Sequence, residues 1–172
     1  IFTTKKPKKN QVYIGYKSFA KDVSPGEKIL IDDGKIKLKV LESNNKDKIR
    51  IKVVVPGVLS SFKGVNLPNT KISLPCLTTK DKKDLTFILK EKIEWLALSF
   101  VRKAEDLISL RKILKRNKSK IGVISKIEKP EAVKNIDEII TYSNAIMVAR
   151  GDLGVEIPPY RVPAIQKKIV KK

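Results

Sequence analysis

The sequence lacks histidine altogether, contains one cysteine, Cys76, and has no apolar run as long as a membrane span. The absence of histidine removes the usual general base near neutral pH and a common zinc ligand. A single cysteine excludes disulfides within the chain, so a reducing cytoplasm is the expected location. A transmembrane helix needs about 20 apolar residues in succession, and we therefore expect no membrane partner.

Acidic residues are also scarce: 18 aspartates and glutamates stand against 38 lysines and arginines, which gives a formal net charge of +20. Such an excess can indicate a nucleic-acid-binding module. Here the lysines are spread evenly over both halves of the chain, which favours a solvated, lysine-rich surface. Binding of single strands also needs aromatic stacking platforms, and residues 1–75 contain only a few scattered aromatic side chains. We therefore expect no nucleic-acid partner and keep the basic module as an alternative.

Residues 1–75 have the pattern of short β-strands separated by turns. The clearest pair, residues 28–32 and 35–40, flanks Asp33-Gly34, which is a strong hairpin signal. In the second arm, isoleucine, leucine and valine alternate with lysine, so one face is buried and the other faces water. Strands of this length and spacing predict a small barrel or sandwich.

Residues 76–172 alternate between helical and strand-like patterns. Four segments have helical spacing: 79–92, with Thr79 as N-cap, 104–116, 130–142 and 161–172. Three apolar runs have the length and branching of buried strands: 94–100, 121–128 and the run that starts at Ala145. Residues 151–154 are predicted to form a tight turn. This alternation predicts an α/β domain with a parallel sheet, open or closed into a barrel.

Charged residues follow two of these buried runs. Side chains two apart in a strand share a face, so Lys126 and Glu128 are expected to point the same way. Parallel sheets place active sites at the carboxyl ends of their strands, and Asp152 is expected at the same edge. Two carboxylates with room for water suit Mg²⁺, and a nearby lysine can neutralise a phosphoryl group in transfer. On pattern alone, Lys126–Glu128 could equally be a surface ion pair and Asp152 a turn residue or helix cap.

Lys63 is a further basic position of interest, because it precedes Gly64 in a predicted loop. Glycine lets the backbone approach a ligand, and the lysine can reach a phosphate. A Lys-Gly pair in a loop is by itself weak evidence for such a site.

Five motifs occur in order along the chain: Asp32-Asp33-Gly34, Lys63 to Pro68, Ser99 to Lys103, Ile124 to Glu128 and Ile146 to Pro158. Together they resemble the motifs of the pyruvate kinase family in its bacterial form. The last two are highly specific, whereas the Asp-Asp-Gly turn alone carries little weight. The resemblance extends over essentially the whole chain, which is interpreted as an internal fragment of such a protein.

The resemblance implies a (β/α)₈ TIM barrel with a small all-β lid domain inserted after its third strand. Residues 1–75 then correspond to the lid domain, incomplete at its N-terminus, and residues 76–172 to the barrel from its third to its sixth helix. The family's K⁺ site and regulatory domain are expected outside this chain. Family members are usually homotetramers, and we expect the piece alone to be inactive and prone to associate through its open sheet edges.

The family reaction transfers a phosphoryl group from phosphoenolpyruvate to ADP, giving pyruvate and ATP. The resemblance implies that Glu128 and Asp152 hold Mg²⁺ or Mn²⁺, and that Lys126 is the catalytic lysine that stabilises the phosphoryl group and the enolate. The implied binding residues are Lys126, Gly151, Asp152, Ser99 and Phe100 for the substrate and Lys63 for nucleotide phosphates. An alternative is another Mg²⁺-dependent barrel enzyme acting on enolates, such as an aldolase or lyase, although a lid carrying Lys63 favours the nucleotide-dependent reaction.

Overall fold

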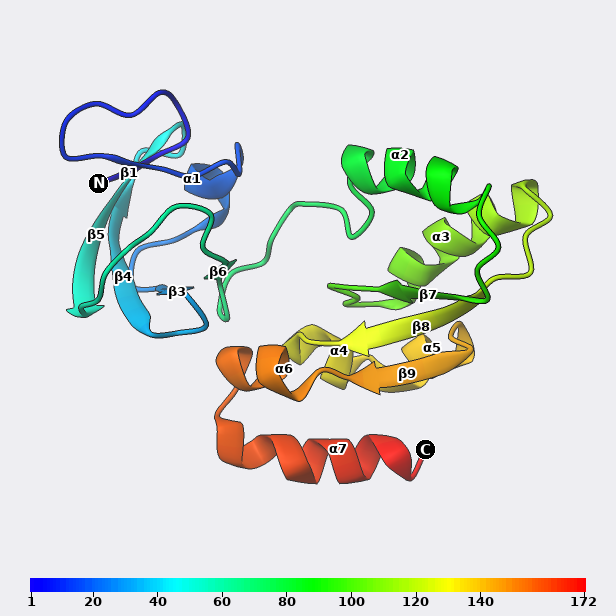
Figure 1. Cartoon of the computed structure of the whole chain (residues 1–172). Coiled ribbons are helices and arrows are strands. Elements are labelled where there is room, and N and C mark those ends of the chain that lie inside the picture. The colour runs from blue at the N-terminus through cyan, green and yellow to red at the C-terminus, as the bar shows by residue number, and fades with distance from the viewer. The chain divides into compact units, whose positions relative to one another are not determined.

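The computed structural model describes all 172 residues, and these fall into two compact units, Ile1–Ser73 and Leu74–Lys172 (Figure 1). Each unit has its own hydrophobic core. None of the helices combines the length and the apolarity needed to cross a bilayer. We describe the two units separately as unit 1 and unit 2, and their assignment to a lid and a barrel stays a prediction.

Unit 1 is built around one six-stranded sheet with the strand order β2-β1-β5-β4-β3-β6. Its elements are β1 (Phe2–Thr3), β2 (Val12–Tyr13), α1 (Phe19–Asp22), β3 (Lys28–Ile31), β4 (Ile36–Ser43), β5 (Lys48–Val55) and β6 (Val65–Asn66). Neighbouring strands are antiparallel, except that β1 and β2 are parallel. In β4, Ile36, Leu38 and Val40 are buried while the lysines between them are exposed, which confirms the predicted alternation. These residues pack with Phe2 and Phe19 in the core of the unit.

The hairpin between β3 and β4 contains the turn that carries Asp32. The two strands pair in register up to Ile31 opposite Ile36. In the turn, Asp32, Asp33 and Gly34 have φ angles of 52°, 55° and 82°. Glycine adopts this left-handed region without steric cost, and aspartate tolerates it better than most side chains do. The predicted hairpin around Asp33-Gly34 is therefore confirmed.

Unit 2 contains a three-stranded parallel sheet in the order β7-β8-β9, with helices in the crossovers (Figure 1). Its elements are α2 (Thr79–Ile88), β7 (Trp95–Leu98), α3 (Ala104–Arg116), β8 (Gly122–Ile127), α4 (Pro130–Lys134), α5 (Ile136–Thr141), β9 (Ala145–Val148), α6 (Arg150–Glu156), the short 3₁₀ helix η1 (Pro159–Arg161) and α7 (Val162–Val170). Strand β8 is central, so β7 and β9 each have a strand neighbour on one side only. The predicted α/β alternation with a parallel sheet is confirmed.

The two faces of β8 have different surroundings. Val123, Ser125 and Ile127 are fully buried, and the two apolar residues belong to a core that includes leucines of α3 and isoleucines of α5. Ile124 and Lys126 alternate with them and are only partly buried. Because successive side chains of a strand point to opposite faces, Lys126 lies on the face away from this helix-covered core.

Some predicted boundaries are wrong for local reasons. Helix α1 lies among residues predicted to be entirely β. The N-cap of α2 is Thr78 and not Thr79, because Thr78 and Asp81 exchange side-chain and backbone hydrogen bonds in a complete capping box. The helix predicted over residues 130–142 is divided into α4 and α5 at Asn135, whose side-chain amide donates to the carbonyl oxygen of Arg102 at 2.9 Å.

Two further predictions fail near the sheet edge. Residues 151–154, predicted as a tight turn, are helical and belong to α6. Strand β7, predicted as buried, has an exposed face: Trp95 is 54% exposed, and Ala97 is also exposed. This face is exposed because the alternate residues of β7, Leu96 and Leu98, are the ones that pack against the helix-lined core.

Candidate active site

The carboxyl ends of the three parallel strands of unit 2 form one edge of the sheet. Ser99 and Phe100 follow β7, and Glu128 follows β8. Pairing continues past the end of β9, because the Ala149 N–H donates to the Ile127 carbonyl oxygen at 3.3 Å. Residues from three segments therefore leave the sheet at the same edge, as parallel strands require.

Lys126 and Glu128 lie at the centre of this edge. Nζ of Lys126 is 2.5 Å from Oε1 of Glu128 and donates a hydrogen bond to Ser99 Oγ at 3.0 Å. The Glu128 side chain is 4% exposed, whereas that of Lys126 is 25% exposed and accessible to a ligand. The contact at Oε1 is an ion pair alone, since this buried oxygen accepts no hydrogen bond. A carboxylate oxygen has two lone pairs, so Oε1 can contact a second cation besides the Lys126 ammonium.

Phe100 contributes its backbone to the site. Its N–H donates to Oε2 of Glu128 at 3.1 Å. The φ angle of Phe100 is 57°, in the left-handed region that costs a residue with a Cβ atom about 1–2 kcal/mol. Its ring is exposed. Backbone strain is thus maintained at the residue whose N–H fixes the buried carboxylate.

The segment that follows β7 is also supported by Cys76. Its Sγ donates a hydrogen bond to the carbonyl oxygen of Ser99 at 3.1 Å. Burial raises the pKa of the Cys76 thiol to about 12, so the reactive thiolate does not form near neutral pH. Cys76 therefore acts as a structural donor beneath Ser99 and not as a nucleophile.

Gly151 and Asp152 lie in the first turn of α6. The first helical hydrogen bond of this segment runs from the Leu153 N–H to the Ala149 carbonyl oxygen at 2.9 Å, so the N–H groups of Gly151 and Asp152 precede the helical ladder. No side chain caps the helix. Both residues are exposed. Asp152 follows Ala149, the residue that pairs with Ile127 at this edge, by three positions, and its carboxylate forms no ion pair with Lys126 or any other cation.

Lys63 belongs to unit 1, where the carboxylate of Asp32 holds it. Nζ of Lys63 is 2.8 Å from Oδ1 of Asp32, and Nζ of Lys35 is 3.0 Å from Oδ2. Hydrogen bonds from Lys63 and Lys35 lower the pKa of the Asp32 carboxyl, and Asp32 in turn raises the pKa of the Lys63 ammonium. The lysine predicted to contact nucleotide phosphates is thus bound to the β3–β4 turn.

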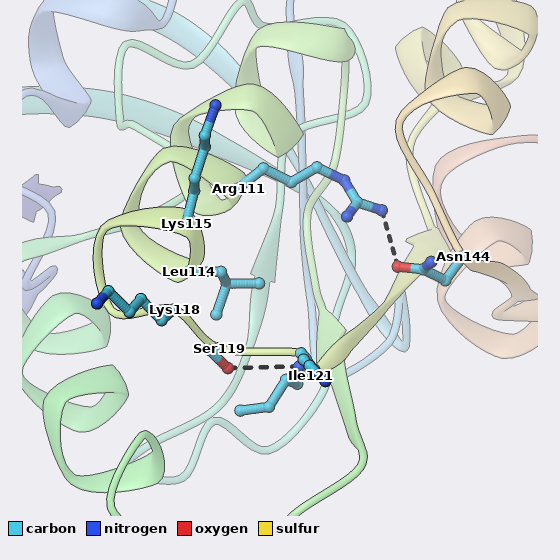
Figure 2. A pocket seen from close by; sticks show the side chains of 8 residues that line it. Arg111, Leu114, Lys115, Lys118, Ser119, Ile121 and Asn144 are labelled. Atoms are coloured by element: carbon cyan, nitrogen blue, oxygen red, sulfur yellow. Dashed lines mark hydrogen bonds between the residues drawn. The ribbon is translucent and has the colours of Figure 1, made fainter.

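A cavity of about 500 Å³ occurs at the opposite edge of the unit 2 sheet (Figure 2). It is lined by Arg111, Leu114, Lys115, Lys118, Ser119, Lys120, Ile121 and Asn144. The guanidinium of Arg111 is already hydrogen-bonded within the protein, because it donates to the Tyr142 carbonyl oxygen and to Oδ1 of Asn144. In Figure 2 the ammonium ends of Lys115 and Lys118 point away from Leu114. None of the predicted site residues lines this cavity, and α/β enzymes place their chemistry at the other edge.

The residues at the carboxyl edge fit a hard divalent cation. Carboxylate oxygens are the ligands that Mg²⁺ and Mn²⁺ prefer, and Oε1 of Glu128 is a buried oxygen without a hydrogen bond. No group of three or more acidic, histidine or cysteine side chains suited to a metal is present. A cation bound here would use few protein ligands and complete its coordination with water and substrate oxygens, as Mg²⁺ usually does.

A family model described as the barrel domain of pyruvate kinase matches residues 2–172. The chain belongs to the pyruvate kinase family. It is 52% identical to the pyruvate kinase of Clostridium acetobutylicum over 160 residues and 48% identical to that of Clostridium perfringens over 160 residues. It is 43% identical to pyruvate kinase 2 of Candida glabrata over 161 residues.

These alignments with pyruvate kinases cover 92%, 92% and 94% of the chain, but only 34%, 34% and 32% of the relatives. The chain therefore spans about a third of the length of the curated relatives it matches. Membership of the pyruvate kinase family, predicted from five motifs, is confirmed. Sequence reasoning missed the Phe100 N–H as a partner of Glu128, because an aromatic residue gives no signal of a positive φ angle.

Proposed function

We propose that the chain is part of a phosphotransferase that moves the phosphoryl group of phosphoenolpyruvate to ADP, giving pyruvate and ATP. The bond between phosphorus and the enol oxygen breaks, a bond to a terminal ADP oxygen forms, and the enolate left behind takes up a proton. The observation that carries this proposal is the Lys126–Glu128 pair at the carboxyl edge of a parallel sheet, in a chain of the pyruvate kinase family.

Lys126 is the catalytic residue in this proposal. Its ammonium stabilises negative charge that develops on the transferring phosphoryl oxygens and on the enolate oxygen. Contacts with Ser99 and Glu128 fix Nζ on one side, and the partial exposure of the side chain leaves the other side open to substrate. A cation that is already oriented needs little reorganisation when charge appears during the reaction.

Glu128 and Asp152 hold Mg²⁺ or Mn²⁺ in this proposal. When bound, the ion supplies positive charge that neutralises substrate oxygens. Glu128 is ready for this role, because the Phe100 N–H and Lys126 fix its carboxylate before any ligand arrives. Asp152 supplies the second carboxylate from the adjoining strand end. K⁺ is proposed as a further cation of the whole protein, bound outside this chain.

The remaining roles concern binding. The N–H groups of Gly151 and Asp152 receive the substrate carboxylate, since they precede the helical ladder of α6. Ser99 and Phe100 line the substrate pocket. Lys63 on unit 1 contacts nucleotide phosphates, and unit 1 acts as a lid whose closure excludes water, so that the phosphoryl group reaches ADP and is not hydrolysed.

For the whole protein we propose the family architecture. Unit 2 would then form part of a (β/α)₈ TIM barrel, unit 1 the inserted lid, and the assembly a homotetramer in the cytoplasm. Support for these finer statements comes from the family membership and from the parallel α/β order of unit 2.

The decisive experiment measures pyruvate formation from phosphoenolpyruvate and ADP by the full-length protein that contains this chain, in a coupled assay with Mg²⁺. Turnover that disappears in the absence of ADP or of divalent metal is the expected result. Absence of pyruvate formation would reject the proposal and favour the aldolase or lyase alternative. Glu128→Gln is expected to abolish metal-dependent turnover, with Lys112→Met, at an exposed position of α3, as a matched control.

A further inference from the structure

A buried ion pair joins the segment after β8 to the last turn of α6. Nζ of Lys129 lies 2.6 Å from Oε1 of Glu156. The two side chains are 8% and 1% exposed, a degree of burial that lysine and glutamate almost never reach unless they are paired. Neither residue belongs to the motif residues assigned above to substrate, nucleotide or metal.

The pair links the two segments that carry the proposed metal carboxylates. Lys129 directly follows Glu128. Glu156 is four residues after Asp152 on α6, so the two side chains lie on one face of the helix, about one turn apart. The contact between Lys129 and Glu156 therefore ties the segment that carries Glu128 to the helix that carries Asp152.

Helix α6 is only weakly stabilised by its own sequence. It has seven residues and no side-chain N-cap, and it includes Gly151 and Gly154. Helices this short are marginal by themselves, and glycine lowers helix propensity further. Only Leu153 and Glu156 are buried. The apolar contacts of Leu153 have no preferred direction, whereas the contact of Glu156 with Lys129 is ionic and directional.

We propose that Lys129 and Glu156 are positioning residues that determine where α6 presents Asp152 to Glu128. The inference rests on the proposed function, in which Glu128 and Asp152 hold a divalent cation. Replacing a buried ion pair by apolar residues of similar size is often neutral for stability. The main effect of this pair is therefore on the geometry of the cation site. A fixed contact between Nζ and Oε1 sets the distance of α6 from the segment after β8 and the rotation of α6 about its own axis.

The test removes both charges together, because removing one leaves an unpaired buried charge that can unfold the protein. The double variant Lys129→Met/Glu156→Leu is made in the full-length protein that contains this chain. Mn²⁺ binding is followed by the electron paramagnetic resonance of the free ion, with thermal melting and kinetics measured in parallel. The dissociation constant of Mn²⁺ is expected to rise about tenfold, the magnitude typical of residues that orient metal ligands. KM for phosphoenolpyruvate rises with it, while the melting temperature changes by only a few degrees.

Two further variants calibrate this result. Glu156→Asp keeps both charges of the pair but shortens the side chain by one methylene, and a smaller rise of about threefold in the Mn²⁺ dissociation constant is expected. Lys80→Gln/Asp84→Asn removes an exposed lysine–carboxylate pair of α2 as a matched control. This control is expected to leave Mn²⁺ binding unchanged.

An Mn²⁺ dissociation constant that stays unchanged in the Lys129→Met/Glu156→Leu variant would overturn the inference. A large fall in melting temperature would also overturn it, because the pair would then serve folding and not position. The proposed function is tested separately by Glu128→Gln in the same binding assay. If that variant binds Mn²⁺ normally, the metal site itself is wrong. If it binds weakly while the double variant does not, only the positioning role fails.

Discussion

The two units hold their candidate lysines in different surroundings. In unit 2, Lys126 contacts the buried carboxylate of Glu128 and the hydroxyl of Ser99. In unit 1, Lys63 contacts Asp32 at a surface turn, where Lys35 shares the same carboxylate. Water and salt weaken ion pairs at the surface much more than buried ones. In the proposed reaction, Lys126 is therefore preorganised for charge that develops, whereas Lys63 would exchange its carboxylate for a phosphate.

Removing the ammonium groups of Lys126 and Lys63 in turn is expected to give the largest difference between the two lysines. Lys126→Met is expected to lower kcat by about 10²–10³-fold, the usual cost of losing one group that stabilises transition-state charge. Lys63→Met is expected to act mainly on KM for ADP, because it removes a binding contact. Steady-state kinetics of the full-length protein with each substrate varied separates the two effects. Similar kcat values for Lys126→Met and the Lys112→Met control would contradict the catalytic role of Lys126.

Replacing the carboxylate that holds Lys63 sharpens the comparison. Asp32→Asn is expected to lower KM for ADP by about threefold, because an exposed ion pair is weak and the amide no longer competes with phosphate. KM for phosphoenolpyruvate should not change. Asp33→Asn is the control, since Asp33 lies in the same turn and forms no ion pair. A rise in KM for ADP would mean that Asp32 positions Lys63 and does not compete for it.

The backbone of the two units gives a third comparison. In unit 1 most positive φ angles fall on aspartate and asparagine, which tolerate them, with Phe62 as the exception, whereas in unit 2 they fall on Phe100 and Lys118. Phe100→Gly is expected to raise the free energy of unfolding by about 0.5–1 kcal/mol, because strain is relieved and the exposed ring loses little burial. Urea denaturation followed by the fluorescence of Trp95, which lies on β7, reports on unit 2. Destabilisation by Phe100→Gly would show that contacts of the ring outweigh the strain.

The smallest effect concerns the titration of Asp32. Hydrogen bonds from Lys63 and Lys35 place its folded pKa below the ordinary value of 3.8. A lowered folded pKa means that the stabilising contribution is fully present above the ordinary pKa and is lost as the pH falls through the folded pKa. An NMR titration of the Asp32 carboxyl carbon should give a midpoint below 3.8 that moves back towards 3.8 in Lys63→Met. Equal midpoints in the two proteins would contradict the ion pair.

Sequence reasoning was most successful where a feature depends on local periodicity. The helix predicted over residues 104–116 is α3, because Leu107, Leu110 and Leu114 repeat at helical spacing and all three are buried. The common orientation of Lys126 and Glu128 likewise follows from the two-residue period of a strand. Element ends were less predictable. The N-cap of α2 is Thr78, one residue before the predicted Thr79, because Thr78 and Asp81 form reciprocal hydrogen bonds.

Contacts between distant residues could not be predicted in this way. The Phe100 N–H reaches Glu128 across 28 positions in the sequence, and Lys129 reaches Glu156 across 27. Neither partner is marked by composition or spacing, since both contacts arise only when β7, β8 and α6 come together. The family motifs pointed to Lys126, Glu128 and Asp152, but the contacts of Phe100 with Glu128 and of Lys129 with Glu156 are evident only in the fold.

The two outer strands of the unit 2 sheet each have one open edge. Because β7 and β9 are each paired along one side, the backbone N–H and C=O groups of their other sides can accept further strands. Next to them, Trp95 and Met147 present apolar surface to solvent. Additional segments of the same polypeptide would extend this sheet, and a second copy of the purified piece could dock on the same groups. The unpaired backbone groups of the two edge strands would then determine whether the purified piece is monomeric, whatever charged residues the site contains.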